Sequence, residues 1–121
     1  MPSVLIAEDD ETMRSLLRTL LEFEGYEVFY LNYLESIDRV LETIGEIKPD
    51  ILLLDVYLNR LDGFELLRRV RSDHGLRSIR VLLSSGRELS RESLEAGADD
   101  FILKPYMPDD LIRKIEKILG N

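Results

Sequence analysis

Hydrophobic positions along the chain follow two patterns, which are short apolar runs and longer stretches with apolar residues three or four positions apart. A run of about four to eight apolar residues is typical of a buried strand, whereas spacing of three and four places side chains on one face of a helix. The apolar runs predict five strands, at residues 4–7, 27–31, 51–54, 81–83 and 101–103. A helix is predicted after each strand, so the chain reads as five strand-then-helix units.

The ends of the predicted helices are marked by residues that start or stop helical structure. The first helix ends at Gly25, the second ends before Pro49, and the last begins at Pro108, because proline suits a first helical turn. The third helix begins near Gly63, and the fourth is a short polar helix around Leu94. The apolar positions of the longer helices are Met13, Leu16, Leu17, Leu20 and Leu21; Leu34, Ile37, Leu41 and Ile44; Phe64, Leu67 and Val70; and Leu111, Ile112, Ile115, Ile118 and Leu119.

Strands that alternate with helices of this length predict an α/β fold with a mainly parallel sheet, because each helix serves as a right-handed crossover. The wholly apolar run at 51–54 fits a central strand that is covered on both faces. No linker or change in composition interrupts the pattern. We therefore expect one domain over residues 1–121.

Composition and charge narrow the class of protein. Apolar residues make up 45% and charged residues 33% of the chain, which is typical of an ordered globular protein. The absence of cysteine and the single histidine, His74, exclude disulfides, thiolate metal sites and histidine-rich metal sites. A net charge of -8 disfavours nucleic-acid binding, and the sequence shows no membrane span or export signal. We expect a cytoplasmic protein that binds other proteins.

Polar residues gather at the carboxyl ends of four of the five predicted strands. In an open parallel sheet these ends lie at one edge, and ligands bind there near the point where the strand order reverses. We therefore expect carboxylates, hydroxyls and an ammonium group along one rim. In chain order these residues are Glu8, Asp9, Asp10, Asp55, Ser84, Ser85 and Lys104.

These residue types favour phosphoryl chemistry. Carboxylates at short range repel one another, so the group must bind a cation or raise a pKa. Few carboxylates with room for water suit Mg²⁺ better than a caged calcium ion. Beside such an ion Asp55 can attack phosphorus, Lys104 can neutralise the oxygens, and Ser85 can hydrogen-bond the new phosphoryl group. The rim therefore predicts an acyl-phosphate site.

Each of these residues also has a purely structural interpretation. The acidic residues at 8–11 can cap a helix and stabilise its dipole, and Asp55 and Ser85 can stabilise turns. Lys104 can be a solvated side chain. Independent turn preferences would not deliver complementary groups from four strand ends to the same rim, which favours the functional interpretation.

Four segments carry a resemblance to a known family. VLIAEDD, LLLDVYLNRLDGFELL, VLLSSG and AGADDFILKPY occur in this order and resemble the receiver domain of two-component response regulators over essentially the whole chain. The resemblance implies a flavodoxin-like, doubly wound sheet of five parallel strands in the order 2-1-3-4-5, with five helices. It also implies a cis peptide bond between Lys104 and Pro105.

The resemblance implies roles for the acidic residues. Asp55 would be the phosphoacceptor, which takes a phosphoryl group from a sensor histidine kinase or a phosphotransfer protein. Mg²⁺ would be held by Glu8, Asp9, Asp55 and the main-chain carbonyl of Tyr57, with Glu8 acting largely through water. Lys104 would complete the catalytic set together with the serine that follows the fourth strand.

That serine is Ser85, and the resemblance implies that Ser85 and Phe101 are the switch residues. Core packing is the alternative for Phe101, which lacks the hydroxyl that a tyrosine would use. Tyr57 and Arg87 each lie two residues beyond a site residue, and we predict that they flank the site and shield the acyl phosphate from water.

The chain departs from the family pattern at three places. Asn59 stands where the family commonly has proline, which predicts a more mobile loop. The segment 85–97 is about one helical turn shorter than usual, and the segment 25–49 is about one turn longer. We therefore expect a short or irregular fourth helix.

Three functions are compatible with these residues to different degrees. The first is a phosphorylation-driven switch that catalyses only its own phosphorylation and dephosphorylation and acts on an unidentified effector. The second is a phosphorylation-independent adaptor with the same fold. The third, an aspartate-nucleophile phosphatase, is disfavoured because Tyr57 occupies the position of its second aspartate. Because the sequence stops near the end of the last predicted helix, we expect either a stand-alone protein or a fragment of a longer one.

Overall fold

The computed structural model describes residues 1–31 and 36–120. Within them, strands and helices alternate as predicted from the hydrophobic pattern. The strands are β1 (Ser3–Ala7), β2 (Glu27–Tyr30), β3 (Ile51–Asp55), β4 (Arg80–Ser85) and β5 (Asp100–Leu103). The helices are α1 (Glu11–Phe23), α2 (Ile37–Ile47), α3 (Gly63–Ser72), α4 (Ser90–Glu95) and α5 (Pro108–Leu119).

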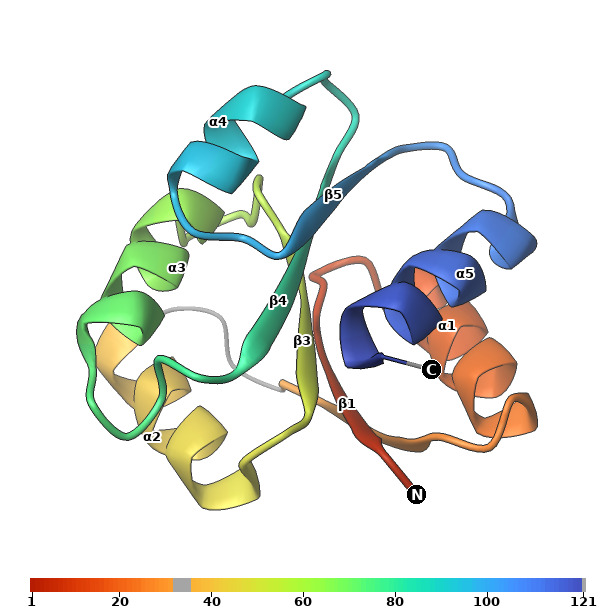
Figure 1. The fold of residues 1–121 in the computed structure, drawn as a ribbon, viewed down its shortest axis with the longest axis horizontal. Helices are drawn as coiled ribbons and strands as arrows, with labels where there is room; N and C mark the ends of the chain where they lie inside the picture. Colours follow the sequence, from red (N-terminus) through yellow and green to blue (C-terminus); the bar gives the residue numbers. More distant parts are fainter. Residues whose placement is uncertain (32–35, 121) are drawn as a thin grey trace.

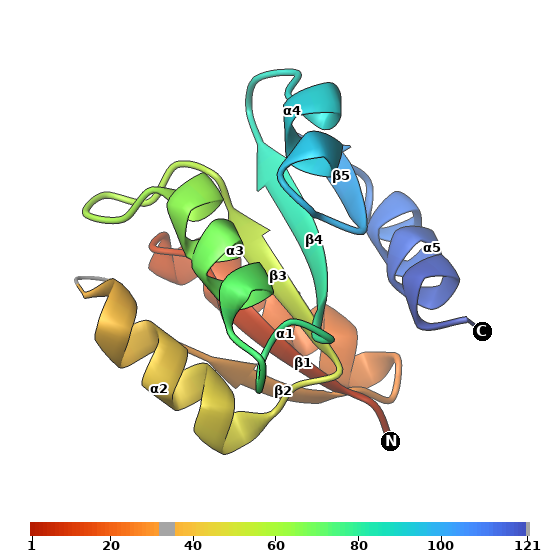
Figure 2. The same cartoon turned by 60° about the vertical axis from the view of Figure 1, so that its left-hand side comes forward.

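The strands form one parallel sheet in the order β2-β1-β3-β4-β5, which confirms the predicted topology. Helices α1 and α5 cover one face of the sheet, and α2, α3 and α4 cover the other (Figures 1 and 2). The register pairs Ala7 with Leu54 and Asp55 with Ser84. The residues that follow β1, β3 and β4 are therefore brought to one edge of the sheet.

Each face of the sheet has its own hydrophobic core. Leu52 and Leu54 of β3 belong to the core beneath α2 and α3, whereas Ile51 and Leu53 belong to the core beneath α1 and α5. All of β3 is buried, as expected for a central strand covered on both sides. The sheet is thus fixed from both faces, and its carboxyl-terminal edge is held in place for a site.

Helix ends near this edge are capped by side chains. The Asp10 side chain accepts a hydrogen bond from the Met13 main-chain N–H at 2.9 Å, and Asp62 does the same for Phe64 at 2.9 Å. Such capping stabilises a helix start by about 0.5–2 kcal/mol. The structural interpretation of the acidic run after β1 therefore holds for Asp10.

Some details of the helices differ from the sequence prediction. Leu16 was predicted on the apolar face of α1 but is 62% exposed. Leu17 and Leu21 are buried, and Leu16 lies about 100° around the helix from Leu17. In α3, Leu66 is buried together with the predicted Leu67 and Val70, and the predicted Phe64 is half-buried. Leu34, predicted in the second helix, lies outside the described residues.

Helix α4 is short, as predicted, with six residues. Its apolar residue Leu94 is 53% exposed, and Ser93 is fully buried instead. None of the helices within residues 1–31 and 36–120 is long and apolar enough to cross a membrane.

Candidate functional site

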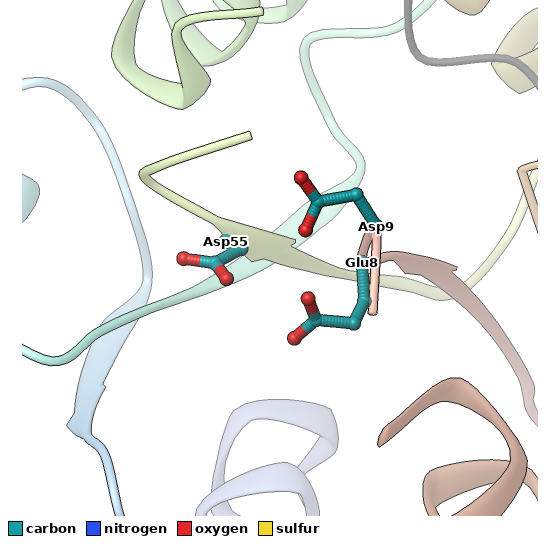
Figure 3. Close-up of side chains that lie close together, drawn as sticks. All are labelled: Glu8, Asp9 and Asp55. Carbon is teal, nitrogen blue, oxygen red and sulfur yellow. The ribbon is translucent and has the colours of Figure 1, made fainter. Parts of the chain in front are cut away.

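Three carboxylates converge at the carboxyl-terminal edge of the sheet. Glu8 and Asp9 directly follow β1, and Asp55 is the last residue of the neighbouring strand β3 (Figure 3). One carboxylate oxygen from each residue lies within 4.8 Å of the others. Glu8 and Asp55 are buried, whereas Asp9 is half-buried. An all-oxygen donor set with one side open to solvent fits a hard divalent cation such as Mg²⁺, which keeps several water ligands.

Lys104 supplies the positive charge at this cluster. Its Nζ atom lies 2.7 Å from Glu8 Oε1 and 2.8 Å from Asp55 Oδ2. Burial alone would lower the pKa of Lys104, but the hydrogen bonds and charges of Asp55 and Glu8 outweigh it and raise that pKa to about 12. The interpretation of Lys104 as a solvated side chain is therefore wrong. The peptide bond between Lys104 and Pro105 is cis, as the resemblance implied.

Ser85 is fully buried at the end of β4. The preceding residue, Ser84, pairs with Asp55 in the sheet, and the Ser85 carbonyl accepts the Lys104 main-chain N–H at 2.8 Å. The Ser85 hydroxyl accepts the Arg87 main-chain N–H at 3.0 Å. Strand β4 thus places Ser85 between the strand ends that carry Asp55 and Lys104. Among the described residues, the Ser85 hydroxyl makes no hydrogen bond to Asp55.

A family model for the response regulator receiver domain matches residues 4–116. The chain belongs to this family. The receiver is similar to the response regulator MprA of Mycobacterium leprae, with 37% identity over 117 residues, covering 96% of this chain and 50% of the relative. It is 32% identical over 120 residues to the phosphate regulon transcriptional regulatory protein PhoB of Pseudomonas aeruginosa, covering 97% and 51% of the two chains. The chain thus spans about half the length of these curated relatives.

Solved structures give the same family and fold for the receiver. A CheY-like response regulator receiver domain protein from Methanospirillum hungatei has a TM-score of 0.85 and 33% identity, covering 99% of this chain and 94% of the other. The signal receiver domain of a signal transduction histidine kinase from Syntrophus aciditrophicus has a TM-score of 0.86 and 30% identity, covering 99% and 91%. Both likenesses confirm the predicted flavodoxin-like receiver fold.

Two exposed side chains of the receiver contact each other beside the carboxylates. Arg87 Nη1 donates a hydrogen bond to Tyr57 Oη at 3.2 Å, and the Tyr57 main-chain N–H donates to Asp55 Oδ1 at 3.2 Å. Tyr57 follows β3 and Arg87 follows β4, so the pair connects the two loops next to Asp55. These are the two side chains that were predicted to flank the site.

Phe101 of the receiver lies in the hydrophobic core beneath α2 and α3 and is 5% exposed. This placement agrees with the core-packing alternative. Its role as a switch residue stays a prediction.

Tyr106 is a residue near the site that the sequence reasoning missed. Burial raises the pKa of Tyr106; the Lys104 charge opposes this rise, and the charges of Glu8 and Asp55 add to it. Tyr106 also lines a cavity of about 10 Å³ together with Glu8 and Asp55. Its position two residues after Lys104 is the signal that could have identified it.

The sequence reasoning also missed a main-chain hydrogen bond to Asp9. The Asn59 N–H donates a hydrogen bond to Asp9 Oδ2 at 2.8 Å. Only the absence of proline at position 59 signals such a bond in the sequence, because every other residue type carries this donor.

Proposed function

We propose that this receiver takes a phosphoryl group on Asp55 in a Mg²⁺-dependent reaction, and that phosphorylation changes its binding to a partner. The observation that supports this best is the Lys104 ammonium group 2.8 Å from the Asp55 carboxylate, at a cluster completed by Glu8 and Asp9. The paired ammonium can offset charge on a transferring phosphoryl group, and the cluster offers a place for a hard cation.

The proposed donor is the phosphohistidine of a sensor histidine kinase or of a phosphotransfer protein, by analogy with the family. The name of the PhoB relative describes a transcriptional regulator, so an output domain or a separate effector is the proposed target of the switch. The net charge of -8 favours a protein partner over direct binding of nucleic acid by this domain. The proposed location is the cytoplasm.

Glu8, Asp9, Asp55 and the Tyr57 carbonyl are the proposed Mg²⁺ ligands. A bound Mg²⁺ would supply charge neutralisation and orientation for phosphoryl oxygens. An Asp55 carboxylate oxygen forms a bond to phosphorus while the P–N bond of the donor breaks, and the imidazole nitrogen keeps the electron pair.

Lys104 and Ser85 are proposed to act on the phosphoryl group itself. Lys104 keeps its proton and pairs with a phosphoryl oxygen, and the Ser85 hydroxyl donates a hydrogen bond to another. In the reset reaction, water attacks phosphorus and the P–O bond to Asp55 breaks. Inorganic phosphate is released and the Asp55 carboxylate is restored.

The test is incubation with acetyl phosphate and Mg²⁺ followed by intact-mass measurement, with beryllofluoride and fluorine NMR as an independent readout. We expect wild type to gain one phosphoryl group and Asp55→Asn to gain none. Asp109→Asn, a change at an exposed aspartate in the first turn of α5, is the matched control and should behave as wild type. Lack of an Asp55-dependent adduct would favour the phosphorylation-independent adaptor.

A further inference from the structure

We infer that the main-chain N–H of Asn59 is a positioning group that holds Asp9 ready for metal binding, an inference that rests on the proposed function. The N–H donates to Asp9 Oδ2 at 2.8 Å, across 50 residues of sequence. Asp9 belongs to the loop after β1, and Asn59 belongs to the loop after β3. One hydrogen bond therefore connects the two loops that carry the candidate ligands.

Asp9 needs such a restraint more than the other two carboxylates do. Glu8 and Asp55 are buried, and both are held by Lys104. Asp9 is half-buried, and within residues 1–31 and 36–120 its side chain has no ion pair and no hydrogen bond other than that from Asn59. Without that bond the Asp9 side chain would sample several rotamers, and metal binding would have to restrict them.

The same bond also restrains the loop after β3, which the absence of proline at position 59 alone predicts to be more mobile. This loop spans residues 56–62 and includes Tyr57, whose carbonyl is a proposed ligand. A bridge between Tyr57 and Asp62 closes it. The Asn59 N–H ties the middle of this loop to Asp9. Ligands from two separate loops are therefore held together before any metal arrives, which lowers the cost of assembling the site.

This restraint depends on the residue type at position 59 in one respect only. Proline has no N–H and cannot make the bond, whereas every other residue can. Position 59 is where receivers commonly have proline, so the donor is a feature of this chain and is not implied by the resemblance. The side chain of Asn59 is exposed and makes no hydrogen bond within the described residues, so the effect should follow the main chain alone.

Magnesium titration of the metal-free protein by calorimetry tests the inference with a matched pair of variants. Asn59→Ala keeps the N–H, and we expect it to bind Mg²⁺ as wild type does. Asn59→Pro removes the N–H, and we expect roughly 3-fold to 10-fold weaker binding, the range for one lost hydrogen bond. Equal affinity in Asn59→Pro and wild type would overturn the inference, as would equal weakening in both variants.

Amide exchange measured by NMR gives a second readout that does not depend on the folding of a proline variant. In metal-free wild type the Asn59 amide should exchange slowly, and in Asp9→Ala it should exchange as fast as an exposed loop amide. Fast exchange in wild type would overturn the inference. If wild type shows this protection but binds no Mg²⁺, the proposed function fails while the Asn59–Asp9 bond stands, so the two failures are distinguishable.

Discussion

Gly63 packs directly on the main chain of Asp55, so that a Cβ atom on Gly63 would lie 2.5 Å from the Asp55 carbonyl oxygen. The same atom would lie 2.8 Å from the Cα of Val56, and the Gly63 N–H donates to the Val56 carbonyl at 2.9 Å. Main-chain atoms cannot rotate aside as a side chain can. The first turn of α3 can therefore pack against the end of β3 because residue 63 has no side chain.

Gly63→Ala should therefore destabilise the protein by about 1–3 kcal/mol, the usual cost of forcing extra atoms into a packed site. Denaturant unfolding measures this change. Gly86→Ala is the matched control, because a Cβ atom there would meet nothing within 4 Å. Equal stability of the two variants would show that the start of α3 can move away from Asp55 at no cost.

Replacing Ser93 should stabilise the protein, which is the opposite of the effect expected for Gly63→Ala. Its hydroxyl is buried on α4 and has no hydrogen-bond partner within the described residues. A buried polar group without a partner costs about 1–3 kcal/mol, so Ser93→Ala should raise the free energy of unfolding by up to that amount. Thermal unfolding would register this as a higher Tm.

Ser90→Ala is the control for Ser93→Ala, because the Ser90 hydroxyl and main-chain N–H both donate to Glu88 at the start of the same helix. We expect no gain in Tm for this variant. An unchanged or lower Tm in Ser93→Ala would mean that the hydroxyl has a partner in solution.

The fold and the site differ in how far the sequence predicts them. The strand order follows once the family resemblance is accepted, and the apolar run of β3 predicts its central place from the residues alone. The convergence of Glu8, Asp9 and Asp55 follows as well, because parallel strands end at one edge. These predictions succeed because they depend on residue types along the strands and at their ends.

The contacts that were missed depend on geometry that residue types do not encode. The Asn59 bond uses a main-chain donor, which nearly every residue type provides. The requirement for glycine at position 63 comes from the approach of two segments, and no positive φ is involved. Leu16 was wrongly placed because apolar spacing does not say where the buried stripe of α1 ends.

Lys104 should stabilise the metal-free protein by about 1–2 kcal/mol, because its pKa rises from 10.5 to about 12 on folding and solvent screens part of this gain. Lys104→Met should lose this amount at pH 7 by denaturant unfolding. A lysine whose pKa is raised on folding contributes its full stabilisation at pH values below its ordinary pKa. This contribution is lost as the pH rises through the pKa of the folded protein. The difference between wild type and Lys104→Met should therefore shrink between about pH 10.5 and pH 12.

Lys114→Met is the control for this measurement. Lys114 lies 3.2 Å from Asp100 in a more exposed ion pair, and such pairs contribute about 0–1 kcal/mol. Equal losses in the two lysine variants, or a Lys104 effect that does not decrease at high pH, would contradict the assigned ion pairs.

The Tyr57–Arg87 pair should slow hydrolysis of the proposed acyl phosphate by limiting the approach of water to Asp55. Tyr57→Ala and Arg87→Ala should each shorten the phosphoryl half-life, on the order of threefold for one lost hydrogen bond. The double variant should lose less than the product of the single effects, because both residues act through one contact. Intact-mass time courses after removal of acetyl phosphate measure these half-lives, with Arg91→Ala, at an exposed arginine of α4, as control. Unchanged half-lives in both single variants would show that the pair does not shield the site.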